Sequence, residues 1–179
     1  RRRPARRPRP PQEPVAPYTG LKVPCYRHNS AKADCSGLGR GEVEMPRWEL
    51  FYHVITATRN REPLIDQQVE EVIRASLHTS AQDGGFIVHA FGAMPDHIHV
   101  VVSNPPSIAV SKTVQSIKGG ATFRINKALP AQKFSWQSEY GVLSFAARDL
   151  DAVSRYVLNQ KSHHASGNLN TALEADQPD

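Results

Sequence analysis

The sequence is poor in cysteine and contains no long hydrophobic run. Its 179 residues include only two cysteines, Cys25 and Cys35, and no CxxC pair. Two cysteines are too few for a disulfide framework or a cysteine-based zinc site, and such sparse use is typical of intracellular proteins. No apolar stretch approaches the roughly 18 residues that a membrane-spanning helix requires, and the Arg-rich start has no apolar signal region. These absences predict a soluble, cytoplasmic protein with no membrane partner.

The first 44 residues are basic and lack a periodic apolar pattern. They hold ten of the 22 Lys and Arg residues, four acidic residues and seven of the 14 prolines. Such a segment cannot bury enough apolar surface to offset its ordering entropy, so we predict that residues 1–44 form a disordered tail, and we favour Met45 as the natural start. Residues 45–179 hold twelve basic and thirteen acidic residues, so the net charge of +5 belongs to the tail. An Arg-rich tail could bind phosphates without sequence preference.

After Met45, hydrophobic periodicity predicts an alternation of strands and helices. The predicted strands are 48–58, 86–94 and 97–103, with short strand-like pieces in 134–146, and the predicted helices are 64–81, 107–129 and about 149–162. This order predicts an α+β fold, a ferredoxin-like split βαβ with an antiparallel sheet of four or five strands, helices on one face and an extra C-terminal helix. We assign residues 45–165 to one domain and residues 166–179 to a flexible C-terminal tail.

Two details of the second helix follow from its sequence. Ser107 comes directly after Asn104-Pro105-Pro106 and is predicted to cap the helix, because a serine hydroxyl accepts from a free backbone N–H at a helix start. Gly119-Gly120 lies in the middle of the helix and is predicted to kink or divide it.

The run AMPDHIHVVVS carries the most informative pair of residues. Side chains alternate between the two faces of a strand, so His97 and His99 share one face about 7 Å apart. Two imidazoles at that spacing can converge on one metal ion. Asp96 has the opposite parity and reaches the metal side only if the Met94-Pro95 turn redirects it. Taken alone, the pair fits equally well two histidines that are hydrogen-bonded on a polar sheet face.

A polar stripe on the last predicted helix offers a partner for this pair. In RYVLNQKSHH, Tyr156 and Gln160 are four residues apart and therefore share a helix face, which His163 and His164 continue. An adjacent apolar stripe could pin the helix to the sheet; it consists of Leu150, Val153 and Val157. The alternative is an ordinary solvated polar face.

Together these segments resemble the single-tyrosine HUH transposases (histidine, hydrophobic residue, histidine) of the insertion-sequence and repetitive-palindrome-associated kinds. The resemblance spans nearly all of residues 45–165, in the family's order. It includes FYHVITATRNREPLI, MPDHIHVVVS, QSIKGGAT, FSWQSEYGVLSF and RYVLNQKSHH.

The resemblance implies an activity and a set of site residues. His97 and His99 correspond to the metal ligands, Gln160 to a third ligand and Tyr156 to the nucleophile, whereas the roles of His163 and His164 stay open. It implies Mg²⁺ or Mn²⁺ as cofactor and single-stranded DNA near a hairpin as substrate. Cleavage would give a 5′-phosphotyrosine and a free 3′-hydroxyl. Family members act as monomers or as homodimers in which the tyrosine helix works in trans.

Several further residues are candidates for DNA contact. The basic ones are Arg59, Arg61, Lys118, Arg124 and Lys127, and the aromatic ones that could stack on bases are Trp136 and Tyr140. Each has an ordinary alternative, a solvated charge or a packing residue. We interpret His53 and His89 as structural.

Two other functions compete with strand transfer. A non-catalytic hairpin DNA- or RNA-binding module on the same fold would need neither the metal nor the tyrosine. A metal hydrolase that uses water would make Tyr156 dispensable, but the sequence shows no evident carboxylate base beside the histidines.

Overall fold

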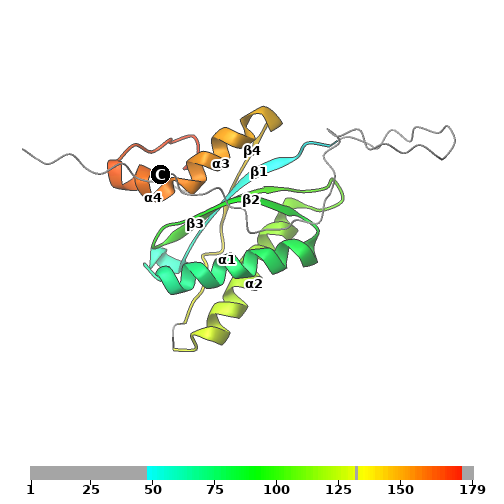
Figure 1. The fold of residues 1–179 in the computed structure, drawn as a ribbon. Coiled ribbons are helices and arrows are strands. Elements are labelled where there is room, and N and C mark those ends of the chain that lie inside the picture. Colours follow the sequence, from blue (N-terminus) through cyan, green and yellow to red (C-terminus); the bar gives the residue numbers. More distant parts are fainter. Residues whose placement is uncertain (1–47, 132, 175–179) are drawn as a thin grey trace, which may run out of the picture. The chain divides into compact units, whose positions relative to one another are not determined.

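The structure is a computed structural model that describes residues 48–131 and 133–174. The tail predicted for residues 1–44 lies outside the described residues. The described part is a four-stranded antiparallel sheet with helices against both of its faces (Figure 1). The predicted α+β fold is confirmed.

The sheet has the strand order β2-β3-β1-β4, and all neighbouring strands are antiparallel. The strands are β1 (Phe51–Ala57), β2 (Ile87–Ala93), β3 (His97–Ser103) and β4 (Gly141–Phe145). β1 and β2 run parallel on either side of β3, which is the predicted split βαβ arrangement. β2 and β3 form an antiparallel hairpin, with a bulge at His89 in β2. Trp136 forms an isolated bridge with Thr58 before β4 begins.

The helices α1 (Gln67–Gly84) and α2 (Val110–Ala128) cover one face of the sheet (Figure 1). From the sheet, β3 contributes Ile98, Val100 and Val102 to the core under these helices, and all three are fully buried. The alternation of β3 therefore divides the strand into an apolar side and the side that carries the histidines.

The starts and the course of both helices differ from the predictions. α1 begins at Gln67, three residues later than predicted, because the Asp66 side chain caps it by accepting from Val69 N–H at 2.8 Å. The prediction that Ser107 caps α2 is wrong: the N-cap is Ala109, and its side chain makes no capping hydrogen bond.

The predicted kink at Gly119-Gly120 is also wrong, because α2 is continuous through both residues. Gly120 serves the packing of α2 on α1 instead. A Cβ atom at Gly120 would lie 2.4 Å from Ser80 Oγ, so the glycine leaves room for this hydroxyl where the two helices meet.

The last predicted helix is divided in two, and both parts lie on the face opposite α1 and α2 (Figure 1). α3 (Leu150–Leu158) and α4 (Gln160–Ser166) meet at Asn159, whose φ of −98° and ψ of 15° are not helical. As predicted, Val153 and Val157 pin α3 to the sheet, where they pack with Ala90 and Val101. The 3₁₀ turns η1 (Arg59–Arg61) and η2 (Ala147–Asp149) follow β1 and β4.

Gly92 on β2 brings the junction of α3 and α4 close to the sheet. A Cβ atom at this position would lie 2.3 Å from the Val157 carbonyl oxygen and 3.3 Å from Gln160 Cβ. Gly92 is also directly opposite His99 in the β2–β3 register. The missing side chain therefore allows Gln160 to approach His99.

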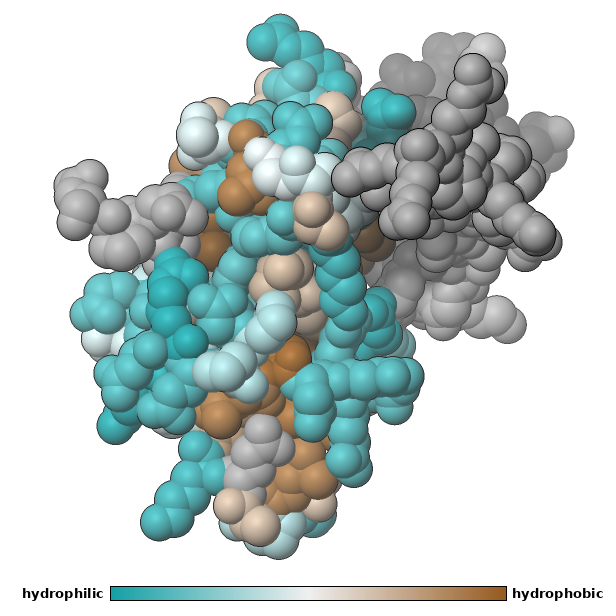
Figure 2. Space-filling model, turned by 90° about the vertical axis from the view of Figure 1, so that its left-hand side faces the viewer, coloured by the Kyte–Doolittle hydropathy of each residue, from teal (hydrophilic) through white to brown (hydrophobic). Residues whose placement is uncertain are grey.

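Figure 2 shows the side of the molecule that lies on the left in Figure 1. Hydrophilic side chains cover most of this side, and a hydrophobic strip is exposed in its lower half, at the level of α2. Among the described residues, no helix combines the length and the apolar character needed to cross a membrane.

Candidate active site

The histidine pair of β3 faces α3 and α4, on the side of the sheet away from α1 and α2. His99 is fully buried and His97 is 6% exposed. Their ring centroids are 5.0 Å apart, with the ring planes at 70° to one another. The two rings are thus close enough to direct nitrogens at a common point, as the strand alternation predicted.

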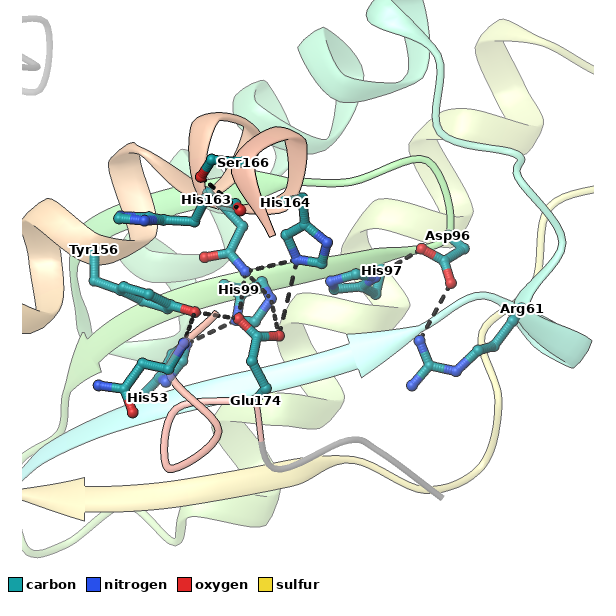
Figure 3. Close-up of polar contacts among 12 residues, drawn as sticks. His53, Arg61, Asp96, His97, His99, Tyr156, His163, His164, Ser166 and Glu174 are labelled. Carbon is teal, nitrogen blue, oxygen red and sulfur yellow. Dashed lines mark hydrogen bonds and ion pairs between the residues drawn. The ribbon is translucent and has the colours of Figure 1, made fainter. Parts of the chain in front are cut away.

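A carboxylate and a guanidinium orient the His97 ring. His97 Nδ1 lies 2.7 Å from Asp96 Oδ1, and Arg61 Nη1 donates to Asp96 Oδ2 at 3.2 Å (Figure 3). Burial alone would raise the pKa of Asp96, but the hydrogen bonds from His97 and Arg61 outweigh it and lower this pKa. The hairpin turn therefore does redirect Asp96, toward the Nδ1 edge of His97.

A second histidine orients His99. His53 Nε2 and His99 Nδ1 are 2.9 Å apart, and His53 is itself fully buried. Burial lowers the pKa of His53 to about 4 and the pKa of His99 to about 2, so both rings are neutral. The interpretation of His53 as structural did not include this contact with the histidine pair.

The C-terminal part of the chain adds polar groups to the same place. Four side chains offer ligand atoms that all lie within 4.8 Å of one another, namely His97, His99, His164 and Glu174. The buried amide of Gln160 lies among them, with its Nε2 atom 3.1 Å from His99 Nε2, 3.0 Å from His164 Nε2 and 2.6 Å from Glu174 Oε1. Burial lowers the pKa of His164. Three imidazoles and a carboxylate thus converge on one buried point.

The donor set fits a divalent cation. An amide nitrogen carries two hydrogens, but Gln160 Nε2 is within hydrogen-bonding distance of three acceptors. The other atom of the same amide, Oε1, is buried and has no partner among the described residues. A crowd of acceptors beside an unpaired amide oxygen is the pattern expected when a cation is needed to balance them.

Tyr156 projects from α3 beside this cluster. Its hydroxyl donates to Glu174 Oε1 at 2.5 Å and accepts from Asn170 N–H at 3.2 Å (Figure 3). Burial and the hydrogen bond to Glu174 raise the pKa of Tyr156 to about 12. The ring stacks on His163 with a centroid distance of 4.7 Å. The two adjacent histidines thus differ, since His163 contacts the tyrosine and His164 joins the ligand cluster.

The five basic residues predicted to contact DNA fall into two groups. Arg59 and Arg61 follow the end of β1, where Ala57 pairs with His97, and Arg61 is bound to Asp96. The other three lie on α2, on the far side of the sheet: Lys118, Arg124 and Lys127.

Two of the three α2 cations are engaged within the protein. Lys118 Nζ donates to the carbonyl of Gln137 at 2.6 Å and to two further carbonyls in the same loop. Arg124 donates to Thr79 Oγ1 at 2.8 Å. Trp136 packs in the core, whereas Tyr140 is 41% exposed and lies near the Lys118 ammonium, at a groove of about 660 Å³.

Two residues of the site were missed by sequence reasoning. Glu174 lies in the predicted flexible tail, and only the fold of residues 168–174 back over α3 and α4 brings its carboxylate into the cluster. His53 is two residues from Ile55, which pairs with His99, and therefore shares the histidine face. Strand parity could have identified His53 once the pairing of β1 with β3 was known.

The histidine pair on the sheet and the tyrosine on α3 face one another, which agrees with the resemblance to DNA transposases seen in the sequence. Residues 46–160 match the family described as "Transposase IS200 like". The match covers well over half of the chain, and the chain therefore belongs to this transposase family. Family membership implies an enzyme that cleaves DNA.

Individual relatives agree with this assignment. The ISDra2 transposase TnpA of Deinococcus radiodurans is 27% identical over 128 residues, which cover 68% of this chain and 89% of the relative. A crystal structure of a candidate transposase from D. radiodurans R1 aligns with a TM-score of 0.54 and 25% identity, over 69% of this chain and 97% of the other.

A third relative shares the fold at lower sequence identity. It is a REP-associated tyrosine transposase whose structure was determined bound to a REP hairpin. It aligns with a TM-score of 0.52 and 17% identity, over 68% of this chain and 73% of the other.

Proposed function

We propose that this transposase cleaves and rejoins single-stranded DNA beside a hairpin, with Tyr156 as nucleophile and a divalent cation held by His97, His99 and Gln160. The product would be a 5′-phosphotyrosine and a free 3′-hydroxyl. The observation that carries the proposal is the carboxylate of Glu174, since its Oε1 atom contacts both the Tyr156 hydroxyl, at 2.5 Å, and Gln160 Nε2, at 2.6 Å. One carboxylate therefore bridges the nucleophile and the ligand cluster, and a phosphate of similar size could do the same.

The metal site would be completed by a turn of the Gln160 amide. The NH₂ group faces the ring nitrogens, whereas a cation would need the amide oxygen on that side. With a cation bound, the unpaired Oε1 atom would face the cluster instead. His164 and Glu174 are further ligand candidates. Mg²⁺ strongly prefers oxygen ligands, so of Mg²⁺ and Mn²⁺ we expect this imidazole-rich set to bind Mn²⁺ more tightly.

The chemistry is a transesterification. A bound divalent cation neutralises phosphate charge and polarises the phosphorus. Tyr156 Oη would form a bond to phosphorus while the bond from phosphorus to the 3′ oxygen breaks. The proton that the phenol loses balances the one that the 3′ oxygen gains. The phosphotyrosine ester can then be attacked by another 3′-hydroxyl, so rejoining needs no external energy source.

Tyr156 is not ready for attack while Glu174 is in place. A phenol with a pKa of about 12 is a poorer nucleophile than free tyrosine, and the carboxylate would repel an incoming phosphate. We therefore infer that Glu174 and the scissile phosphate compete for one position. Residues 168–174 would have to withdraw before cleavage.

The proposed substrate is a hairpin with a single-stranded flank. The hairpin in the REP-associated relative supports this choice. On this chain, Arg59 and Arg61 lie at the end of β1 beside His97 and are the cations best placed to hold a strand that enters the site. Lys118, Arg124 and Lys127 stay candidates for hairpin contact from the other face. Phosphate contacts of this kind would set the position of the strand and not its sequence.

The site we propose is complete within one chain, because Gln160 contacts His99 of the same chain. A homodimer in which the tyrosine helix works in trans is the other arrangement open to the family. Mixing a Tyr156→Phe protein with a His97→Ala protein separates the two, because only a trans arrangement restores cleavage.

The decisive experiment incubates the full chain with Mn²⁺ and hairpin oligonucleotides that carry a label on the 3′ side of the flank. A covalent protein–DNA adduct should appear on a denaturing gel with the wild type and be absent with Tyr156→Phe. Hairpin binding in EDTA should be equal for the two proteins. A folded, Mn²⁺-loaded wild type that forms no adduct with any hairpin of a varied flanking library would overturn the proposal.

A further inference from the structure

His53 is a fully buried histidine on β1 that the proposed reaction does not use. Its Nε2 atom is 2.9 Å from His99 Nδ1, while the two ring centroids are 5.1 Å apart and the ring planes differ by only 23°. The rings therefore meet at their nitrogen edges, nearly in one plane, as a hydrogen bond between imidazoles requires. Within the described residues, the hydrogen bond of His53 to the ligand cluster is the one to His99.

The direction of this hydrogen bond can be worked out from the far side of the His99 ring. His99 Nε2 lies 3.1 Å from Gln160 Nε2, and an amide NH₂ group can only donate. The orientation of that amide is fixed by Glu174, because its carboxylate oxygen at 2.6 Å from Gln160 Nε2 is an acceptor and would repel an amide oxygen. The two hydrogens of Gln160 Nε2 are shared among Glu174, His99 and His164, but the amide nitrogen accepts none in return. A hydrogen on His99 Nε2 would face a group that cannot accept it, so we assign the free lone pair of His99 to Nε2.

The hydrogen of neutral His99 is then on Nδ1, and it is donated to His53 Nε2. His53 in turn must carry its own hydrogen on Nδ1. That atom is buried and has no partner among the described residues. A buried donor without a partner is unfavourable, and native structures keep such groups mainly where another function requires them. The opposite arrangement would avoid this unpaired donor, but it would put a hydrogen on the nitrogen of His99 that faces the cluster.

We propose that His53 is a positioning residue that holds His99 in the tautomer whose free Nε2 faces the metal site. The inference rests on the proposed function, since a free Nε2 matters only if a metal binds there. It parallels the contact of Asp96 with His97, because in each case a neighbour takes the Nδ1 hydrogen. Hydrogen bonds to the second ring nitrogen fix the tautomer of metal-ligating histidines in general.

Three variants test the role of His53. His53→Phe fills the space but removes the acceptor, whereas His53→Gln keeps an acceptor oxygen on a side chain of similar length. His89→Phe is the matched control, because His89 is a histidine of the same sheet whose Nε2 atom contacts Ser103 Oγ at 2.8 Å.

The first measurement needs no metal. Long-range ¹H–¹⁵N NMR spectra of the metal-free full chain report which ring nitrogen carries the hydrogen. We expect His53 and His99 of the wild type both to be protonated at Nδ1, and His99 to shift toward the Nε2-protonated form in His53→Phe. Protonation of His99 at Nε2 in the wild type would overturn the inference, whether or not a metal binds.

The second measurement is Mn²⁺ binding by calorimetry, with hairpin binding in EDTA as the folding control. Loss of a hydrogen-bonding partner of a metal ligand typically weakens metal binding by about 10- to 100-fold. We expect a loss in that range for His53→Phe, a much smaller loss for His53→Gln and none for His89→Phe. Wild-type Mn²⁺ affinity in folded His53→Phe would refute the positioning role. A wild type that binds no Mn²⁺ but shows the expected tautomers would instead count against the proposed metal site.

Discussion

The two faces of the sheet differ in the side chains that they bury, although β3 contributes to both. Under α1 and α2, β3 presents Ile98, Val100 and Val102 to an apolar core. Under α3 and α4, the same strand presents His97 and His99, and the apolar cluster there has four buried members among the described residues. The first face is filled with side chains that need no partner. The second face combines this small apolar cluster with polar groups that each need a partner.

This difference shows where the fold is stabilised and where it is specialised. Apolar burial contributes roughly 25 cal/mol per Å² of area removed from water, so the larger apolar face contributes most of the stability. The polar face contributes less, since its hydrogen bonds largely replace bonds to water. Because the apolar core on the other face stabilises the sheet, the polar face can contain more hydrogen-bond acceptors than donors.

Neighbouring residues on β3 offer the largest test of this division. We expect Ile98→Ala to lower the free energy of unfolding by about 2–5 kcal/mol through the cavity it leaves, while the folded fraction still binds Mn²⁺. His97→Ala should leave the free energy of unfolding nearly unchanged and impair the metal site instead. Its loss of a metal ligand should slow adduct formation by about 1000-fold, since metal assistance is worth several kcal/mol.

Chemical denaturation and adduct gels on both variants check this pair. Equal loss of stability from the two changes, or normal adduct formation by His97→Ala, would contradict the division of labour between the faces.

A glycine on each face gives the second test. A Cβ at Gly92 would lie 2.3 Å from the Val157 carbonyl oxygen, whereas Gly119 on α2 has nothing within 4 Å. We expect Gly92→Ala to cost about 1–3 kcal/mol and to weaken Mn²⁺ binding, because it displaces α3 and α4. Gly119→Ala should instead stabilise the protein by about 0.5–1 kcal/mol through better helix propensity. Thermal unfolding and Mn²⁺ calorimetry check this pair. A Gly92→Ala protein with wild-type stability and wild-type Mn²⁺ affinity would contradict the prediction.

The third test concerns the negative charge of Glu174, whose carboxylate lies in the ligand cluster on the polar face. Glu174→Gln keeps the shape of the side chain and removes its negative charge. A unit charge about 4 Å away is worth about 1 kcal/mol even in bulk water, so adduct formation should become about fivefold faster with saturating Mn²⁺. Initial rates on the denaturing gel measure this. A slower reaction under these conditions would mean that Glu174 assists the reaction instead of competing with the phosphate.

The smallest expected effect is that of the ion pair that joins the two helical layers. Lys161 on α4 contacts Glu70 on α1 at 2.5 Å, but the lysine side chain is 69% exposed. Exposed pairs contribute about 0.2–1 kcal/mol, so a double-mutant cycle with Lys161→Met and Glu70→Gln should give a coupling energy in that range. A coupling of several kcal/mol would mean that the two faces are not independent.

The histidine pair and its partner helix could be predicted from the sequence because both depend on short-range periodicity. Alternation along β3 put His97 and His99 on one face, and the apolar stripe through Val153 and Val157 predicted a helix packed on the sheet. These local patterns were sufficient because the side chains that they place on one face are the ones that pack together in the fold.

The missed features depend on contacts between residues that are distant in the sequence. Asn159 has no proline or glycine signal, so nothing local predicts that the last helix breaks there. The contact of His53 with His99 requires the β1–β3 register. Glu174 follows a polar stretch without periodicity, and only its partners Tyr156 and Gln160 define its place.

The break at Asn159 has one further consequence. A straight helix would make Tyr156 and Gln160 move as one body, with a fixed separation. In this protein they belong to two short pieces that share a single joint, the backbone of Asn159. Because Val153 and Val157 hold α3 on the sheet, a small rotation at that residue would move Gln160 relative to Tyr156. The separation of the two side chains is thus set by two torsion angles of one residue.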